Sequence, residues 1–163
     1  LSDSINDNYL LLAKINKNNI DYNIATCQLE DSKFKQKQYD QVINNLSNIK
    51  NLIITGDFKI NEEEDHYYNL NLNLWKDTWI VDGKEDKKRY TSDFKTNIFV
   101  KNNQNRYDRI LFKKNDLELI SHQLIGKNYN PTPSYRYGIL VQFKINNTNN
   151  SNSELPLLAK IST

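Results

Sequence analysis

Hydrophobic residues along this chain gather in short runs that polar residues separate. Residues 9–15 and 20–26 are two such runs, and the polar triplet 17–19 between them is typical of the turn of a β-hairpin. Residues 52–55 are apolar or β-branched and stop at a glycine, which predicts a short buried strand. A further strand is predicted at 106–112.

One helix is predicted between the hairpin and the strand at 52–55. Its apolar positions follow the pattern i, i+3, i+4, i+7 and i+10, which makes one buried stripe of Tyr39, Val42, Ile43, Leu46 and Ile49. Asp31 and Ser32 can cap its start. Three lysines fall outside the stripe and are interpreted as a solvated face, with contact to a phosphate backbone as the alternative: Lys33, Lys35 and Lys37.

The strand at 52–55 leads directly into Gly56 and Asp57. A carboxylate at the exit of a buried strand has a rigid support at the sheet edge, which is where α/β folds place their chemistry. An Asx-type turn after the strand is the plainer interpretation.

Three other features look like functional sites but have simpler interpretations. Residues 62–66 are four acids and a histidine, yet consecutive side chains point in different directions and do not converge on a metal, so we interpret them as a solvated helix start. Trp79 and Tyr90 could stack on a nucleobase, but packing is the expected role of such rings. His122 lies in the middle of a predicted strand, away from every motif.

Four segments carry motifs in a fixed order. They are Thr26-Cys27-Gln28-Leu29-Glu30, which resembles T-x-H-L-E, Gly56-Asp57-Phe58-Lys59, which resembles G-D-x-N, Arg106-Tyr107-Asp108-Arg109-Ile110-Leu111-Phe112, which resembles R-x-D-R-I-F-F, and Pro133-Ser134-Tyr135-Arg136-Tyr137-Gly138-Ile139-Leu140, which resembles P-S-D-H-x-G-L-L. Together they resemble the endonuclease/exonuclease/phosphatase superfamily of Mg-dependent phosphodiesterases, and most of all its 5′-tyrosyl-DNA phosphodiesterase branch. The resemblance covers about residues 9 to 145.

The resemblance implies a fold and a domain layout. The family fold is a two-sheet α/β sandwich, and this chain resembles only its second half, so we expect a partial sandwich at residues 1–145. The first half, with an Asn and a metal-binding Glu, has no match here. We expect an Asn-rich linker at 146–153 and a C-terminal tail at 154–163 that docks on a neighbouring surface. Because residue 1 is Leu and the chain has no Met, we expect a processed or truncated product.

The family's catalytic positions are only partly kept. Asp57 and Asp108 match the family, whereas Lys59 replaces the motif Asn, Arg136 replaces the motif His, and Gln28 replaces the His of the first motif. Arginine keeps its proton near neutral pH, so Arg136 cannot act as a titrating histidine. We therefore predict that Arg136 lies within salt-bridge distance of Asp57 or Asp108 and that Lys59 joins them. A phosphate site built from these cations is the alternative.

Composition limits the remaining possibilities. The formal net charge is +2, so the chain is not a polycation that binds nucleic acid through bulk charge, and any such binding needs a local patch. Cys27 is the single cysteine, which excludes an internal disulfide and fits a reducing, intracellular compartment. No apolar run is long enough for a membrane span.

Two functions follow from these observations. The first is a non-catalytic binding or structural module derived from a Mg-dependent phosphodiesterase, which needs no cofactor and forms part of a larger assembly. Another protein chain would cover its bare sheet face, so the purified chain should not be a monomer; nucleic acid is a further candidate partner. The second is an active Mg-dependent phosphodiesterase completed by a separate or missing N-terminal half. Whether the chain is an enzyme is left open between the two.

Overall fold

The computed structural model describes residues 1, 8–31, 33–65, 68, 74–129, 132–145 and 157–161. Its elements follow in the order β1 (Leu10–Lys17), β2 (Ile20–Gln28), α1 (Lys35–Leu46), β3 (Leu52–Asp57), η1 (Glu62–Glu64), β4 (Trp75–Asp77), α2 (Thr78–Val81), η2 (Asp86–Lys88), β5 (Ser92–Asp93), β6 (Gln104–Asn105), β7 (Asp108–Lys113), β8 (Leu117–Ile125), β9 (Gly138–Ile145) and β10 (Leu157–Ile161). The predicted hairpin, helix and strands are all present.

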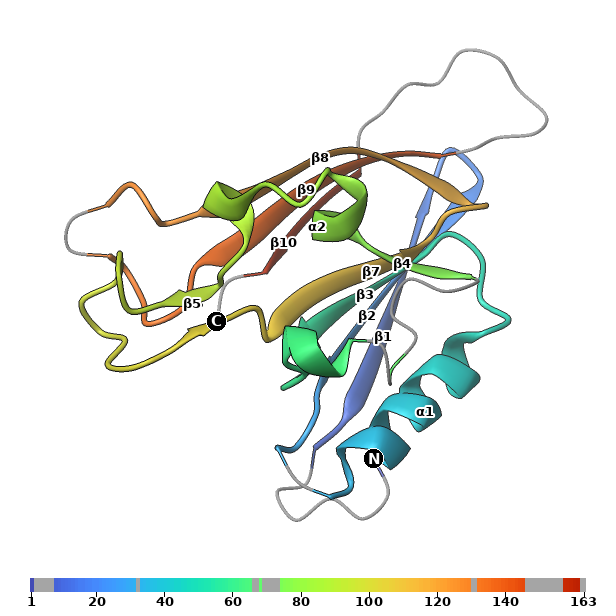
Figure 1. The fold of residues 1–163 in the computed structure, drawn as a ribbon. Helices are drawn as coiled ribbons and strands as arrows, with labels where there is room; N and C mark the ends of the chain where they lie inside the picture. Colours follow the sequence, from blue (N-terminus) through green and yellow to red (C-terminus); the bar gives the residue numbers. More distant parts are fainter. Residues whose placement is uncertain are drawn as a thin grey trace.

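A five-stranded sheet in the order β1-β2-β3-β7-β4 forms the centre of the molecule. β2 and β3 run parallel and α1 connects them, whereas the other neighbouring pairs are antiparallel. α1 packs on one face of this sheet (Figure 1), where Tyr39, Val42 and Leu46 join the core. The predicted apolar stripe of the helix is therefore buried.

The second sheet, in the order β10-β9-β8, covers the opposite face of the central sheet. Ile53 of β3 and Phe112 of β7 pack there against Val141 and Phe143 of β9. The rings of Phe112 and Phe143 lie 5.0 Å apart. The layers are thus helix, sheet and sheet, which confirms the predicted partial α/β sandwich.

The helix begins later than the sequence predicted. Phe34 is its N-cap and makes no side-chain capping bond, so Asp31 does not cap it, and Ser32 lies outside the described residues. Ile49 lies beyond its last turn but still packs against the core. Within the described residues, no helix is long and apolar enough to cross a membrane.

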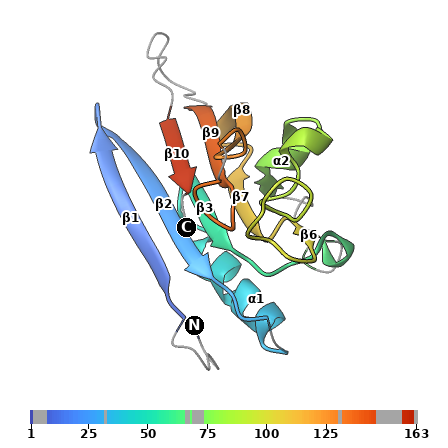
Figure 2. The ribbon, with the colours of Figure 1, turned by 90° about the vertical axis from the view of Figure 1, so that its left-hand side faces the viewer.

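Both ends of the chain extend the two sheets. Residues 157–161 of the predicted tail form β10, which pairs antiparallel with β9 at the edge of the second sheet, while the predicted linker at 146–153 lies outside the described residues. At the other end, β1 is the edge of the central sheet and lies apart from the second sheet (Figure 2).

One row of residues across the central sheet shows which of its strands the second sheet covers. Pairing aligns Ala13, Ile24, Ile53 and Phe112 on the same face of four neighbouring strands. Ile53 and Phe112 are buried under the second sheet, Ile24 is half-buried and Ala13 is exposed. The second sheet therefore covers β3 and β7 and leaves β1 open.

Candidate functional site

Three strands bring the predicted site residues to one end of the central sheet. In the pairing of β2, β3 and β7, Gln28 is opposite Asp57 and Asp57 is opposite Asp108, so all three share one face. Gly56 allows the backbones of β2 and β3 to lie close together at this end of the sheet. Its φ is +152°, and a Cβ there would lie 1.9 Å from the Cys27 carbonyl oxygen, so no other residue fits without moving the strands apart.

Arg136 lies between the two carboxylates. It comes from the loop before β9, and its Nη1 lies 2.7 Å from Asp108 Oδ2 while its Nη2 lies 3.3 Å from Asp57 Oδ2. The salt bridge predicted from the sequence is confirmed. Lys59 also takes part, because its Nζ lies 2.7 Å from Asp57 Oδ2. Its backbone N–H donates to Asp57 Oδ1 at 3.2 Å, so the Asx-type turn forms as well.

The surroundings of Asp108 make it depend on Arg136. Asp108 is buried, and the Thr91 hydroxyl donates to its Oδ2 at 2.7 Å. Its Oδ1 is buried and has no hydrogen-bond partner among the described residues. Burial alone would lower the pKa of Arg136, but Asp108 and Asp57 outweigh burial and raise that pKa above its usual value. Arg136 is therefore a fixed positive charge in the cleft.

The residues present do not fit a magnesium site. Mg²⁺ needs oxygen ligands arranged around one point, and here Oδ2 of Asp57 and Oδ2 of Asp108 each contact a cationic side chain. No group of three or more His, Cys, Asp or Glu residues able to hold a metal occurs in the part of the chain that the structure describes. Gln28 is exposed at its strand end, and its side chain makes no hydrogen bond or ion pair with the described residues.

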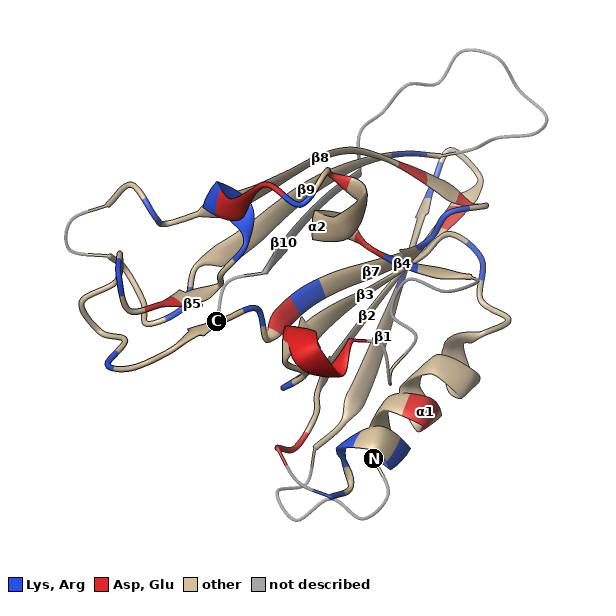
Figure 3. Ribbon diagram, in the orientation of Figure 1, with Lys and Arg blue, Asp and Glu red and all other residues tan. Residues whose placement is uncertain are grey.

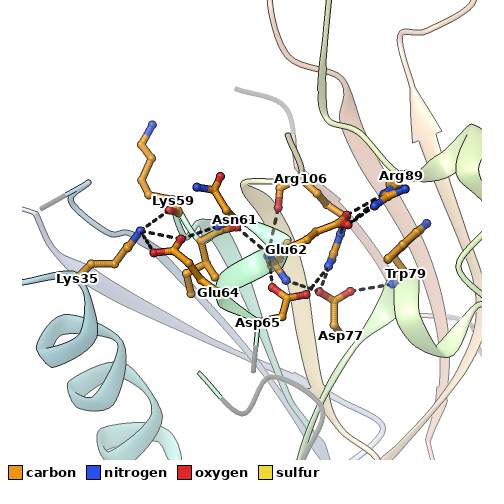
Figure 4. A network of polar contacts seen from close by, with 12 residues as sticks. Lys35, Lys59, Asn61, Glu62, Glu64, Asp65, Asp77, Trp79, Arg89 and Arg106 are labelled. Atoms are coloured by element: carbon orange, nitrogen blue, oxygen red, sulfur yellow. Dashed lines mark hydrogen bonds and ion pairs between the residues drawn. The ribbon is translucent and has the colours of Figure 1, made fainter. Parts of the chain in front are cut away.

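A second cluster of charges surrounds η1 and the start of β7 (Figure 3). Asp77 is fully buried and pairs with both Arg106 and Arg109, the latter at 3.3 Å. Asp65 also contacts both arginines, at 3.1 and 2.7 Å. Glu62 pairs with Arg89 and Arg106 (Figure 4). The helix start predicted at residues 62–66 is present as η1, but the prediction that it is solvated is wrong for Glu62 and Asp65, which are ion-paired. His66 lies outside the described residues.

Lys35 is a second correction. The helical stripe placed it on a solvated face, yet it is buried and its Nζ lies 2.9 Å from Glu64 Oε1. Its Nζ also donates to the Lys59 carbonyl oxygen at 2.9 Å, which ties α1 to the loop after β3. Lys33 and Lys37 are exposed as predicted. Sequence periodicity missed Lys35 because the two groups that hold its Nζ at 2.9 Å lie more than 20 residues away in the sequence.

Trp79 has the packing role expected of it, whereas Tyr90 is half-buried. Trp79 is buried, its Nε1 donates to the Glu85 carbonyl oxygen at 3.0 Å, and the Arg106 guanidinium lies 4.5 Å from its ring centre. His122 is buried and its Nδ1 lies 2.9 Å from the Thr78 hydroxyl. Thr91, which contacts Asp108, had no sequence signal of its own.

Several solved structures have a fold similar to that of this chain. TDP2 from D. rerio, complexed with a single-strand DNA product, matches with a TM-score of 0.74 and 23% identity over 84% of this chain and 62% of that one. TDP2 from C. elegans, in truncated form, matches with a TM-score of 0.66 and 18% identity over 85% and 60%. An endonuclease/exonuclease/phosphatase family protein from Bacteroides thetaiotaomicron matches with 0.57 and 13% over 77% and 51%. The chain has the endonuclease/exonuclease/phosphatase fold.

This result confirms the family resemblance of the four motifs at the level of the fold. No family model matches the sequence, and a search of curated proteins finds no match. The chain spans between 51% and 62% of the length of these three structures. Only the part of the endonuclease/exonuclease/phosphatase fold that the chain covers is therefore established.

Proposed function

We propose that this chain is a non-catalytic module on a phosphodiesterase fold and works as one component of a larger assembly. The observation that carries the proposal is Arg136, which contacts both Asp57 and Asp108 where the family places a histidine. The two carboxylates are the family positions that remain, and each is neutralised by a neighbour from this same chain.

The chemistry of phosphodiester hydrolysis argues in the same direction. Such a reaction needs a group that can orient or deprotonate water and a cation that stabilises the developing charge on phosphorus. Asp57 is held by Lys59 and Arg136, which disfavours its use as a base, and an arginine cannot pass a proton near neutral pH. The ion pairs instead support a closed, stabilised cleft.

The open edge of the central sheet supports the assembly part of the proposal. β1 exposes Leu11, Leu12 and Ile15, with 64%, 48% and 48% of their surfaces accessible. Soluble proteins rarely leave neighbouring apolar side chains of one edge strand uncovered. Leu11 and Ile15 lie on the same face of β1 as Ala13, so another protein chain that covers this face and the adjoining face of β2 would bury both of them.

Light scattering on the freshly purified chain tests the assembly. We expect a species larger than a monomer, and we expect Leu11→Lys combined with Ile15→Lys to return it to a monomer without loss of folding. The matched control is Ile120→Lys, which changes an exposed isoleucine of β8. A chain that is a cooperatively folded monomer at all concentrations would contradict self-assembly. If Leu11 and Ile15 also stay exposed to solvent in the native complex, the proposal as a whole is contradicted.

The alternative is a working Mg-dependent phosphodiesterase completed by further chain. Lys59 and Arg136 would then clamp a phosphate group, and the ion pairs would open when substrate binds. Mg-dependent hydrolysis of a 5′-phosphotyrosyl oligonucleotide by the native assembly, lost on Asp57→Ala, would establish this alternative in place of the proposal.

A further inference from the structure

The Glu62 carboxylate lies in a position that suits an external anion. Both of its oxygens contact Arg89, whose Nε lies 3.0 Å from Oε1 and 3.1 Å from Oε2, and whose Nη2 contacts Oε2. Arg106 adds a third nitrogen, its Nε at 3.2 Å from Oε1. Two guanidinium groups that converge on one anion are the arrangement by which proteins bind phosphate.

The two arginines are held in place by contacts other than Glu62. Arg106 is buried, pairs with Asp77 and Asp65, and lies against the Trp79 ring. The Arg89 guanidinium lies 4.9 Å from the ring centre of the adjacent tyrosine, Tyr90, and 5.7 Å from that of Trp79. Removal of the Glu62 charge should therefore leave the guanidinium groups where they are, facing an empty position.

A cavity opens beside this ion pair. It has a volume of about 400 Å³ and is lined by both arginines together with Glu62, Tyr90 and Asn105, among others. No hydrogen bond to the Asn105 or Tyr90 side chain occurs within the described residues, so both polar groups are available to a ligand in the cavity. The cavity is large enough for a phosphate group that carries an organic substituent.

Glu62 differs from its neighbour Glu63 in the same turn. Glu63 also lines the cavity, but it is exposed and forms no ion pair among the described residues. Burial alone would raise the pKa of Glu62, yet Arg89 and Arg106 outweigh burial and hold that pKa below its usual value. Glu62 therefore stays ionised at neutral pH and remains ion-paired with both guanidinium groups.

We propose that Arg89 and Arg106 form an anion-binding site for a phosphate group, and that Glu62 closes this site by taking the position of the phosphate. A phosphate dianion carries more charge than a carboxylate and has a third oxygen that can reach Asn105 or Tyr90, so it competes with Glu62. The cavity is not lined by Asp57, Asp108 or Arg136, and the proposal does not depend on the function proposed above.

The test compares Glu62→Gln with Glu63→Gln and the unchanged chain. Melting temperature and calorimetric titration are measured with inorganic phosphate, with a nucleoside 5′-monophosphate and with the matching nucleoside. Glu62→Gln should bind the two phosphates roughly tenfold or more tightly than the unchanged chain, because one charged competitor for the guanidinium groups is gone. Glu63→Gln should bind phosphate like the unchanged chain. It is the control for the general effect of losing one negative charge near the cavity.

The outcomes show whether the phosphate site exists and whether it takes an organic phosphate or free phosphate. Tighter binding of the monophosphate than of inorganic phosphate indicates an organic phosphate that fills the cavity, and equal binding indicates free phosphate. Addition of Arg89→Ala to Glu62→Gln should abolish the gain. If Glu62→Gln is less stable, phosphate should restore its melting temperature more than it raises that of Glu63→Gln. No difference between the two glutamine variants in either measurement overturns the proposal.

Discussion

Replacement of Arg136 by alanine should destabilise the fold through Asp108. Asp57 would keep Lys59 as its partner, but Asp108 would retain only the Thr91 hydroxyl, with its second oxygen unpartnered. The Asp108 side chain is 4% exposed, so water cannot replace the lost cation without a rearrangement. The loss of one partner of a buried ion pair costs about 3 kcal/mol or more, because a charge is left uncompensated in a poorly solvated site.

Urea unfolding of Arg136→Ala, Asp108→Asn and the double variant measures this effect. We expect a loss of about 3 kcal/mol for Arg136→Ala and recovery of most of it when Asp108→Asn is added, because the buried charge is then removed. Lys87→Ala, which removes an exposed partner of Glu85, serves as the control and should change stability little. A loss below about 1 kcal/mol for Arg136→Ala, the range of surface ion pairs, would refute this interpretation of the cleft.

Three further outcomes are expected. Gly56→Ala should prevent stable folding or lower the melting temperature strongly, as circular dichroism would show, because its Cβ would collide with the β2 backbone. Burial raises the pKa of Cys27 to about 12, so a thiol reagent at pH 8 should react only after denaturant is added, and rapid labelling of the native chain would contradict this. Burial alone would raise the pKa of Asp77, but Arg106 and Arg109 outweigh it and hold the pKa below its usual value. Asp77 therefore stabilises the fold above about pH 4, and this contribution should be lost as the pH falls below that value. Asp77→Asn should therefore lose less stability between about pH 5 and about pH 3 in urea unfolding than the unchanged chain does, and an equal loss in both would contradict this.

Local patterns in the sequence were sufficient for the hairpin, the buried strand and the apolar stripe of α1. These features depend on neighbours within a few residues, so periodicity and turn residues specify them. The contact of Arg136 with Asp57 and Asp108 could also be predicted, because the order of the motifs placed all three at converging strand ends.

The charge network around η1 could not be predicted in the same way. Lys35 and Glu62 look like surface residues, since charged residues are usually solvated. Their partners, such as Glu64 for Lys35 and Arg106 for Glu62, lie 29 and 44 residues away and meet them only in the folded chain. The sequence signal that comes nearest to this network is the pair Arg106 and Arg109 on either side of Asp108. Both arginines are buried, and buried charges need acidic partners close by.

Hydrolysis of bis-p-nitrophenyl phosphate in the presence and absence of Mg²⁺ tests the central claim most directly. The account predicts no Mg-dependent release of p-nitrophenol by this chain above that of its Asp57→Ala variant, because Arg136 and Lys59 occupy the carboxylates that a phosphodiesterase would use. Mg-dependent turnover that disappears on Asp57→Ala would contradict it.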